Sequence, residues 1–420
     1  ALFGRVLGRA AAINRADSFF DLGGHSLLAT QLIGLARERW SSDLPLRLIF
    51  DAPTVSDFAR AVEGRLADAR PLPASGLAAL PWTGDIPLSF AQQQFYLLDE
   101  LAQQRGAFNV PAAIALSGAV DLDALAASLS EIVRRHEILR TRLVRSGEQL
   151  VQIIDPPRPL HPSLIDLGSS HDPGSRASAF ADLLRQAVEH PFDLAAEPPL
   201  RVIVVKLADD DHRVLLTFHH SATDEWSLSV MAREFSALYA AYRQPDAPAH
   251  PLGDLQLQYA DYAMWQRSDA AAALLPERVR RWTEHLAGAA TVLALPTDGM
   301  RPAAGGFNAA ALPFTLPPKV ADGLNALARS QRVTLFMVLL AGLQIVLSRW
   351  SGQSNFLIGT PVAGRQDRRL EALLGCFINT LVLRADLSGD PDIGELLDRA
   401  REAALFAYDN QDVPFERLVA

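Results

Sequence analysis

The sequence predicts a multidomain protein in which a small all-α bundle of four helices precedes a larger α/β part. Three observations lead to this fold class. The chain has 420 residues, which is too long for one ordinary hydrophobic core. Residues 1–66 carry helical patterns without a strand pattern. From residue 87 onward, helical and strand patterns alternate.

The helical bundle is expected to span residues 1–66. It opens with an amphipathic pattern over the first seven residues, and its last helix begins at Thr54, because Thr54 and Asp57 resemble a capping box. Residues 67–86 are rich in proline and small residues, which break helices and strands, so we expect a semi-extended linker there. The prolines are Pro71, Pro73 and Pro81.

The α/β part is expected to begin with a half that covers residues 87–270. Apolar residues at helical spacing predict a helix over 121–139. Residues 200–206 and 214–219 are two apolar runs around a polar turn, which is typical of paired strands.

A second half is expected over residues 271–420, with the division near 268–290. Helical spacing covers residues 320–350. Strand patterns follow at 356–359 and 381–384, so this half is also mixed α/β.

The composition narrows the possible functions. Hydrophobic residues make up 49% of the chain and charged residues 21%, as in globular proteins. The net charge of -9 gives no basic surface for nucleic acid, and no 18-residue uncharged apolar run is present to span a membrane. The single cysteine, Cys376, excludes an internal disulfide and fits the cytoplasm. The N-terminus has neither an initiator Met nor a signal peptide, so we expect an excerpt of a longer chain.

A glycine pair precedes a serine in Gly23-Gly24-His25-Ser26. The glycines let the backbone turn sharply, and Ser26 opens a helical pattern. The N–H groups at a helix N-terminus favour a phosphodiester. The alternative is that Ser26 is merely a helix N-cap.

The whole segment around Ser26 resembles the peptidyl carrier domains of nonribosomal peptide synthetases. The resemblance covers residues 19–28, 44–46 and 50–55 and extends over essentially all of 1–66. It implies that a phosphopantetheinyl transferase attaches 4′-phosphopantetheine to Ser26. The thiol of that group would then carry an aminoacyl or peptidyl thioester.

Two adjacent histidines, His219 and His220, end the apolar strand pattern at 214–219, and Asp224 follows. Successive strand residues face opposite sides, so only one of the two rings can face a given cleft. Asp224 could orient an imidazole or anchor an arginine. A structural histidine pair stays an equal alternative on local chemistry. A metal site is disfavoured, because no further His or Cys cluster supplies ligands.

The histidine string resembles the double-histidine motif of nonribosomal peptide synthetase condensation domains. Five further motifs of that family occur in order, at 89–92, 135–141, 259–265, 375–380 and 410–416. The resemblance implies two chloramphenicol-acetyltransferase-like halves in a V shape, with a tunnel between them. His220 would sit midway along the tunnel, with His219 as its packing partner.

The resemblance also implies that Asp224 is structural and pairs with an arginine. The candidates for this pairing are Arg365, Arg135 and Arg140. The implied reaction is attack of an amine on a thioester. A neutral imidazole with a pKa near ~6.5 suits proton acceptance, although His220 could also act by holding the amine in place.

The sequence departs from the family pattern at two places. Position 225 is Glu where the family usually has Gly, so Glu225 and Ser227 are candidate residues of the substrate channel. A side chain at 225 that turns away from the channel stays an alternative. The family pattern continues beyond a sixth motif, whereas this sequence ends at Ala420, so we expect the second half to be incomplete.

Other functions and the partners follow from the same resemblance. An epimerisation domain shares the double-histidine motif, and a degenerate condensation-like domain would recruit other proteins instead of catalysing a reaction. For a carrier-condensation pair, the expected partners are a downstream aminoacyl carrier domain and upstream adenylation and condensation domains.

Overall fold

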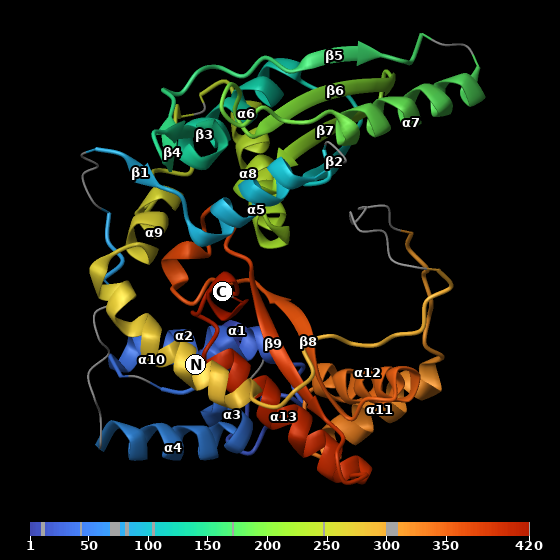
Figure 1. The fold of residues 1–420 in the computed structure, drawn as a ribbon. Coiled ribbons are helices and arrows are strands. Elements are labelled where there is room, and N and C mark those ends of the chain that lie inside the picture. Colours follow the sequence, from blue (N-terminus) through green and yellow to red (C-terminus); the bar gives the residue numbers. More distant parts are fainter. Residues whose placement is uncertain are drawn as a thin grey trace.

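The computed structural model describes residues 1–9, 13–42, 44–67, 76–79, 84–102, 106–169, 172–246, 248–299 and 310–419. Figure 1 shows the N-terminal helices, in blue, beside the lower of two α/β halves. The upper half runs from cyan to yellow-green along the chain, and the lower half from yellow to red. The linker prolines expected at 71, 73 and 81 lie outside the described residues.

The N-terminal bundle contains α1 (Leu2–Val6), α2 (Ser26–Trp40), α3 (Arg47–Asp51) and α4 (Val55–Ala67). Its helices share one core, in which Phe19 and Leu32 are fully buried. Oγ1 of Thr54 accepts a hydrogen bond from the Asp57 N–H at 3.1 Å, so the predicted start of the last helix is confirmed.

The main sheet of the first half contains β2 (Asn109–Ser117), β5 (Ser163–Asp166), β6 (Leu200–Ala208) and β7 (Asp211–His219). The strand order is β2-β7-β6-β5, with β5 parallel to β6 and the other neighbours antiparallel. Strand β7 is buried along most of its length, as its continuous apolar run requires. The two predicted strands are confirmed, and each is slightly longer than the pattern indicated.

Three helices belong to the same half as this sheet: α6 (Leu122–Arg135), α7 (Pro173–Glu189) and α8 (Glu225–Tyr242). Helices α6 and α8 pack against each other, and α7 packs against β2 and β7. The helix predicted over 121–139 ends at Arg135, before the 3₁₀ turn Glu137–Arg140. The helix stops because His136 adopts an extended backbone and buries its ring against Glu234, 2.8 Å away.

A smaller sheet and three helices complete the first half and lead to the second. They are β1 (Ile86–Pro87), β3 (Thr141–Ser146), β4 (Gln149–Ile154), α5 (Phe90–Leu101), α9 (Tyr259–Gln266) and α10 (Asp269–Leu286). The strand order is β1-β4-β3. Helix α5 begins with a capping box between Ser89 and Gln92, which fixes the direction in which it enters the junction of the halves.

The second half contains α11 (Pro318–Ser330), α12 (Leu335–Ser351), β8 (Asn355–Val362), β9 (Asn379–Asp386), α13 (Ile393–Asp409) and α14 (Glu416–Val419). The two strand patterns correspond to β8 and β9, and these strands pair antiparallel. The single helical stretch expected over 320–350 is wrong. It is divided because Arg332 has a left-handed backbone, with φ of 54°, and Thr334 caps a new helix.

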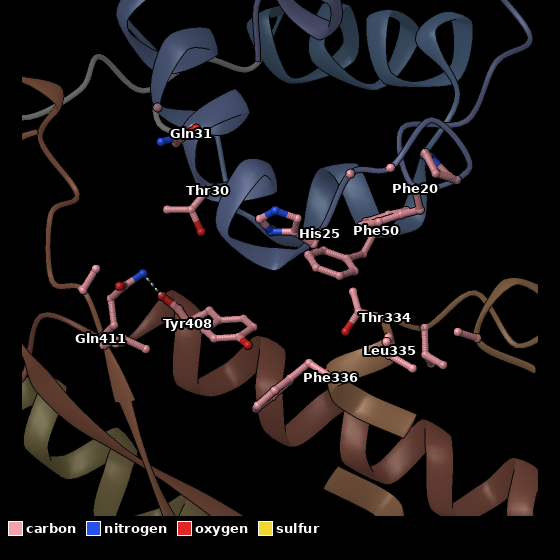
Figure 2. Close-up of a pocket in the computed structure, with 18 of the residues that line it drawn as sticks. Phe20, His25, Thr30, Gln31, Phe50, Thr334, Leu335, Phe336, Tyr408 and Gln411 are labelled. Carbon is pink, nitrogen blue, oxygen red and sulfur yellow. Dashed lines mark hydrogen bonds between the residues drawn. The ribbon is translucent and has the colours of Figure 1, made fainter. Parts of the chain in front are cut away.

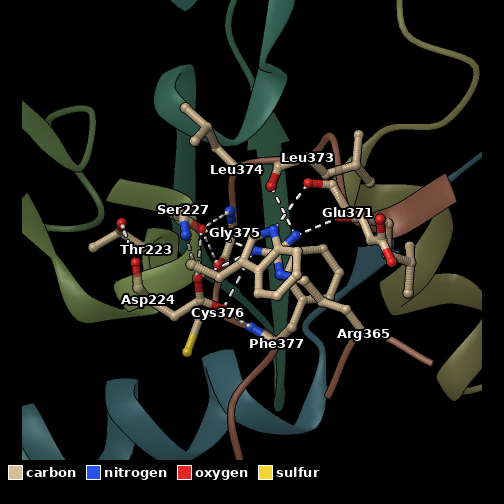
Figure 3. A network of polar contacts seen from close by, with 12 residues as sticks. Thr223, Asp224, Ser227, Arg365, Glu371, Leu373, Leu374, Gly375, Cys376 and Phe377 are labelled. Atoms are coloured by element: carbon tan, nitrogen blue, oxygen red, sulfur yellow. Dashed lines mark hydrogen bonds and ion pairs between the residues drawn. The ribbon is translucent and has the colours of Figure 1, made fainter. Parts of the chain in front are cut away.

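A buried ion pair joins the two halves. Nη2 of Arg365, which follows β8, lies 3.1 Å from Oδ1 of Asp224, the N-cap residue of α8. Asp224 also accepts hydrogen bonds from the N–H groups of Ser227 at 2.8 Å and Phe377 at 3.1 Å (Figure 3). The carboxylate therefore ties the start of α8 to the loop that precedes β9.

The Nη1 group and the flat face of the guanidinium have partners as well. Its Nη1 donates to the carbonyl oxygens of Leu370 and Leu373, and the guanidinium lies 3.9 Å from the centre of the Phe377 ring (Figure 3). A buried charge with this many partners has one low-energy position, so the pair fixes how the halves meet.

Replacing Arg365 with alanine is expected to lower the free energy of unfolding by about 3–5 kcal/mol, because the buried Asp224 carboxylate would lose its counter-ion. Urea unfolding monitored by circular dichroism measures the loss. Arg368→Ala is the control: this arginine pairs with Glu38 at 3.4 Å on the surface, and its loss is expected to cost at most about 1 kcal/mol. Equal effects of the two substitutions would contradict the role of the buried pair.

Candidate active site at the junction of the two halves

Strand β7 carries the two adjacent histidines to the junction of the halves. His219 is its last residue, and His220 opens the 3₁₀ turn His220–Ala222. The His220 N–H donates to the carbonyl oxygen of Phe108 at 2.9 Å, which fixes the backbone as the strand ends. The two rings have different surroundings, as the alternation of strand residues predicts.

The His219 ring is packed inside the first half. Its Nδ1 accepts a hydrogen bond from the Ser221 N–H at 3.2 Å and lies 2.8 Å from the Ser221 hydroxyl. Its Nε2 lies 3.8 Å from a carboxylate oxygen of Asp99. Only 1% of the side chain is exposed, so this ring cannot contact a substrate.

The His220 ring is half-buried and held on one face by an aromatic side chain. It stacks on Phe95 of α5, with ring centroids 4.2 Å apart and planes 11° from parallel. Burial lowers the pKa of His220 below its ordinary value, against the smaller opposing effect of the backbone carbonyls of His220 and Thr223. The imidazole is therefore neutral near pH 7.

Cys376 of the second half lies beside this ring, with Sγ 3.9 Å from Nδ1 of His220. Burial raises the pKa of the Cys376 thiol well above its ordinary value, so the thiol keeps its proton. The Tyr259 hydroxyl donates to the Cys376 carbonyl at 2.5 Å. Gly375 has a φ of 153°, and a side chain there would collide with the Tyr259 ring. The loop is thus held firmly against His220.

The two candidate channel residues lie in different places. Glu225 is the exposed first residue of α8, five positions after His220. Ser227 is fully buried: its hydroxyl donates to Asp224 at 2.7 Å and lies within hydrogen-bonding distance of Arg365 and Gly375. The expectation that Ser227 lines a channel is wrong, because the third residue of α8 bonds back to its cap.

Each of the three candidate arginines pairs with a different carboxylate. Arg365 contacts Asp224, whereas Arg135 pairs with Glu234 at 3.1 Å and Arg140 with Glu137 at 3.2 Å. The last two are therefore excluded as partners of the aspartate. Arg135 is the last residue of α6 and Arg140 the last residue of the 3₁₀ turn that follows, and each already pairs with another carboxylate.

Near the N-terminus of the chain, helix α2, which begins at Ser26, has a start suited to bind an anion. Gly23 has a φ of 97°, and a side chain at Gly24 would collide with the Phe19 ring. His25 is the N-cap residue, so Ser26 opens α2 and does not cap it. Within the described residues no side chain caps α2, which leaves its first N–H groups for a phosphodiester. This start fits a phosphorylated serine.

A cavity of about 920 Å³ separates the start of α2 from the second half. Figure 2 shows His25 and Phe50 of the bundle on one wall and Phe336 and Tyr408 of the second half on the other. Trp226, in the first turn of α8, also lines the cavity. The cavity therefore extends from the start of α2 towards α8, the helix that Asp224 caps.

Two other kinds of site find no support. Among the described residues, no group of three or more His, Cys, Asp or Glu side chains is arranged to hold a metal ion. In the same residues, no single helix has the length and hydrophobicity to cross a membrane. Helices α11 and α12 meet those criteria only as a pair, and they are bent by 108°.

Sequence reasoning missed two side chains that lie beside the His220 ring, Phe95 and Cys376. Cys376 lies in the motif at 375–380, which was a weak signal for a site residue. Phe95 lies in α5 beyond the motif at 89–92, and no sequence pattern marks it. Their proximity depends on the junction of the halves, which the sequence does not encode locally.

Comparisons with known proteins identify the family of each part of the chain. Residues 83–420 match the Condensation domain family, and residues 1–62 match the phosphopantetheine attachment site family. The dimodular nonribosomal peptide synthase of Bacillus subtilis (strain 168) is 42% identical over the whole chain, which spans 17% of that relative. Malpinin synthetase of Mortierella alpina is 38% identical over 97% of the chain, which spans 5% of that relative.

Solved structures support the fold. The X-domain from teicoplanin biosynthesis matches with a TM-score of 0.74 and 29% identity, over 82% of this chain and 75% of that one. A four-domain nonribosomal peptide synthetase matches with a TM-score of 0.69 and 25% identity, over 82% of this chain and 25% of that one. The chain belongs to the condensation-domain family of nonribosomal peptide synthetases and carries a phosphopantetheine attachment domain before its condensation domain.

Proposed function

We propose that this chain carries an aminoacyl or peptidyl group on Ser26 and transfers it to an amine beside His220, forming an amide bond. The observation that carries the proposal is the His220 ring, half-buried and neutral where the two halves meet. When bound to Ser26, 4′-phosphopantetheine supplies the thiol that holds the acyl group as a thioester. The uncapped start of α2 supports this attachment.

His220 is the catalytic residue of this proposal. A neutral imidazole accepts a hydrogen bond or a proton from the attacking amine, and Phe95 and Cys376 hold the ring in one orientation. His219 and Asp224 are positioning residues, because their side chains are buried and occupied by other contacts. Orientation of two tethered substrates contributes as well.

The order of domains indicates the partners. We assign residues 1–66 to the carrier, 67–86 to the linker, 87–270 to the first half and 271–420 to the second half of the condensation domain. The carrier is then the donor, and a separate downstream aminoacyl carrier domain brings the amine. Upstream adenylation and condensation domains load the donor, and a phosphopantetheinyl transferase modifies Ser26. A single, buried cysteine fits a cytoplasmic location.

His220→Ala is expected to slow amide formation by on the order of 10²–10⁴, because the variant loses the group that accepts the amine proton. A single-turnover reaction between loaded Ser26 and an aminoacylated downstream carrier, followed by mass spectrometry of the carriers, measures the rate. His161→Ala, at an exposed position of the first half, is the control and is expected to react normally. Near-normal product from the His220 variant would refute the assignment. Stereochemical inversion of the donor without amide formation would indicate an epimerisation domain.

The pKa of His220 is expected below ~6.5, because burial disfavours the imidazolium. NMR titration of histidine-labelled protein measures it, and His220→Gln assigns the resonance. The ring is then neutral throughout the range above its lowered pKa and becomes charged only at more acidic pH. A midpoint at or above ~6.5, the ordinary value for histidine, would contradict the proposed environment.

Glu225 is proposed to face the acceptor side and to favour amines that carry a second positive charge. The basis is its exposed position at the start of α8, five positions after His220 in the sequence. Glu225→Gln is expected to raise the KM for such acceptors by about two- to fivefold, the effect of one exposed charge pair, with kcat little changed. Glu148→Gln, in the exposed turn between β3 and β4, is the control. Unchanged KM values across several acceptors would rule out this role.

A further inference from the structure

The carrier bundle contacts the second half through charged groups of opposite sign. Arg47 of α3 donates two hydrogen bonds to the carboxylate of Glu402, at 2.8 and 2.9 Å. Asp51 of the same helix pairs with Arg401. These contacts hold the bundle so that the start of α2 faces the 920 Å³ cavity.

Charged side chains of the bundle and of the second half line this cavity, and half of them have an ion-pair partner. The lining charges are Asp21, Asp51, Asp57, Glu371, Arg329, Arg332, Arg365 and Arg368. The existing pairs are Asp51 with Arg47 and Arg401, Asp57 with Arg60, Arg365 with Asp224, and Arg368 with Glu38. Burial raises the pKa of Glu371, and Asp21 is solvent-exposed.

Two arginines of the cavity remain without a carboxylate partner among the described residues. Arg329 lies in the last turn of α11, and Arg332 lies in the turn between α11 and α12. Both are exposed to solvent. Arg332 has a φ of 54°, a backbone conformation that non-glycine residues seldom adopt. The end of α11 and the turn after it therefore place two arginines on the cavity wall opposite the bundle, and neither has a carboxylate partner among the described residues.

The facing wall supplies the complementary half of an anion site. Gly24 and His25, which directly precede Ser26, line the same cavity, and α2 begins there without a side-chain cap in the described residues. A phosphodiester on Ser26 would stand at this helix start, and guanidinium groups bind phosphate oxygens by paired hydrogen bonds. The cavity volume lies within the range of about 300–1,000 Å³ typical of small-molecule sites.

We propose that Arg329 and Arg332 bind the phosphodiester of the phosphopantetheine group on Ser26 and thereby direct its arm into the cavity between the carrier and the second half. The arm would then run past Trp226, in the first turn of the helix that Asp224 caps. The inference deepens the proposed function, on which it rests, by giving the donor carrier a binding site in its own chain.

The covalent connection supports binding within one chain. Leu77 is buried in the core of the first half, so the linker is anchored there. Nine residue steps separate Ala67, the end of α4, from Gly76, and at about 3.3–3.6 Å a step they reach about 30 Å at most. A tether this short keeps the carrier at a high effective concentration near its site, so a weak phosphate contact is sufficient.

The test uses the full chain with 4′-phosphopantetheine on Ser26, and it follows the phosphodiester by ³¹P NMR. The double variant Arg329→Gln/Arg332→Asn removes both charges, and asparagine tolerates the left-handed backbone at 332. Arg329→Lys/Arg332→Lys retains the charges. Arg349→Ala removes an exposed arginine of α12 outside the cavity lining and is the matched control. Circular dichroism checks that each variant is folded.

In the wild type and the Arg349 control, a bound phosphodiester is expected to give a broad resonance that sharpens as salt is added. In the double variant the line should narrow by roughly twofold or more at low salt, since a released arm moves on the nanosecond scale. The lysine variant should keep a broad line. A wild-type line that is already narrow and insensitive to salt, or an unchanged line in the double variant, would overturn the inference.

The ³¹P NMR result and the reaction of His220→Ala together separate a failure of the arginine site from a failure of the proposed function. If the phosphodiester is free but His220→Ala still abolishes amide formation, the arginine site is wrong and the function stands. If the phosphodiester is bound but His220→Ala reacts normally, the arm has a site and the assigned catalytic residue is wrong.

Discussion

The ion pair between Asp224 and Arg365 is the contact on which the candidate site depends. The Asp224 carboxylate caps α8 and also accepts a hydrogen bond from the Phe377 N–H. One side chain therefore fixes both the start of α8, just after the 3₁₀ turn that follows β7, and the loop that carries Cys376. Desolvation makes such a pair a weak source of net stability, but breaking it leaves a buried charge. Its main effect is therefore to allow one arrangement of the two halves.

That arrangement explains the environment of His220. Phe95 from the first half covers one face of the ring, and Cys376 from the second half lies beside Nδ1. The ring stays neutral because it is half-buried, and it is held in place before a substrate arrives. A preoriented neutral imidazole serves an amine attack equally well as a proton acceptor or as a hydrogen-bonding partner.

Local patterns predicted much of the fold, because a strand or cap is determined by nearby residues. The apolar run of β7 and the cap at Thr54 are examples. Long-range contacts were beyond such patterns. The sequence could not select Arg365 over Arg135, since 141 positions separate it from Asp224. Ser227 was misplaced because its bond to the helix cap was overlooked. The break before α12 was missed because Arg332 takes a backbone conformation that its residue type seldom adopts.

The central claim is that one chain both carries the donor and forms the bond. Intact-protein mass spectrometry of the wild-type chain, loaded with an aminoacyl group on Ser26 and mixed with an aminoacylated downstream carrier, tests it directly. The account predicts that this chain loses the mass of its aminoacyl group and that the downstream carrier gains the same mass. An aminoacyl group that stays on Ser26, or that is released only as the free acid, would contradict the account.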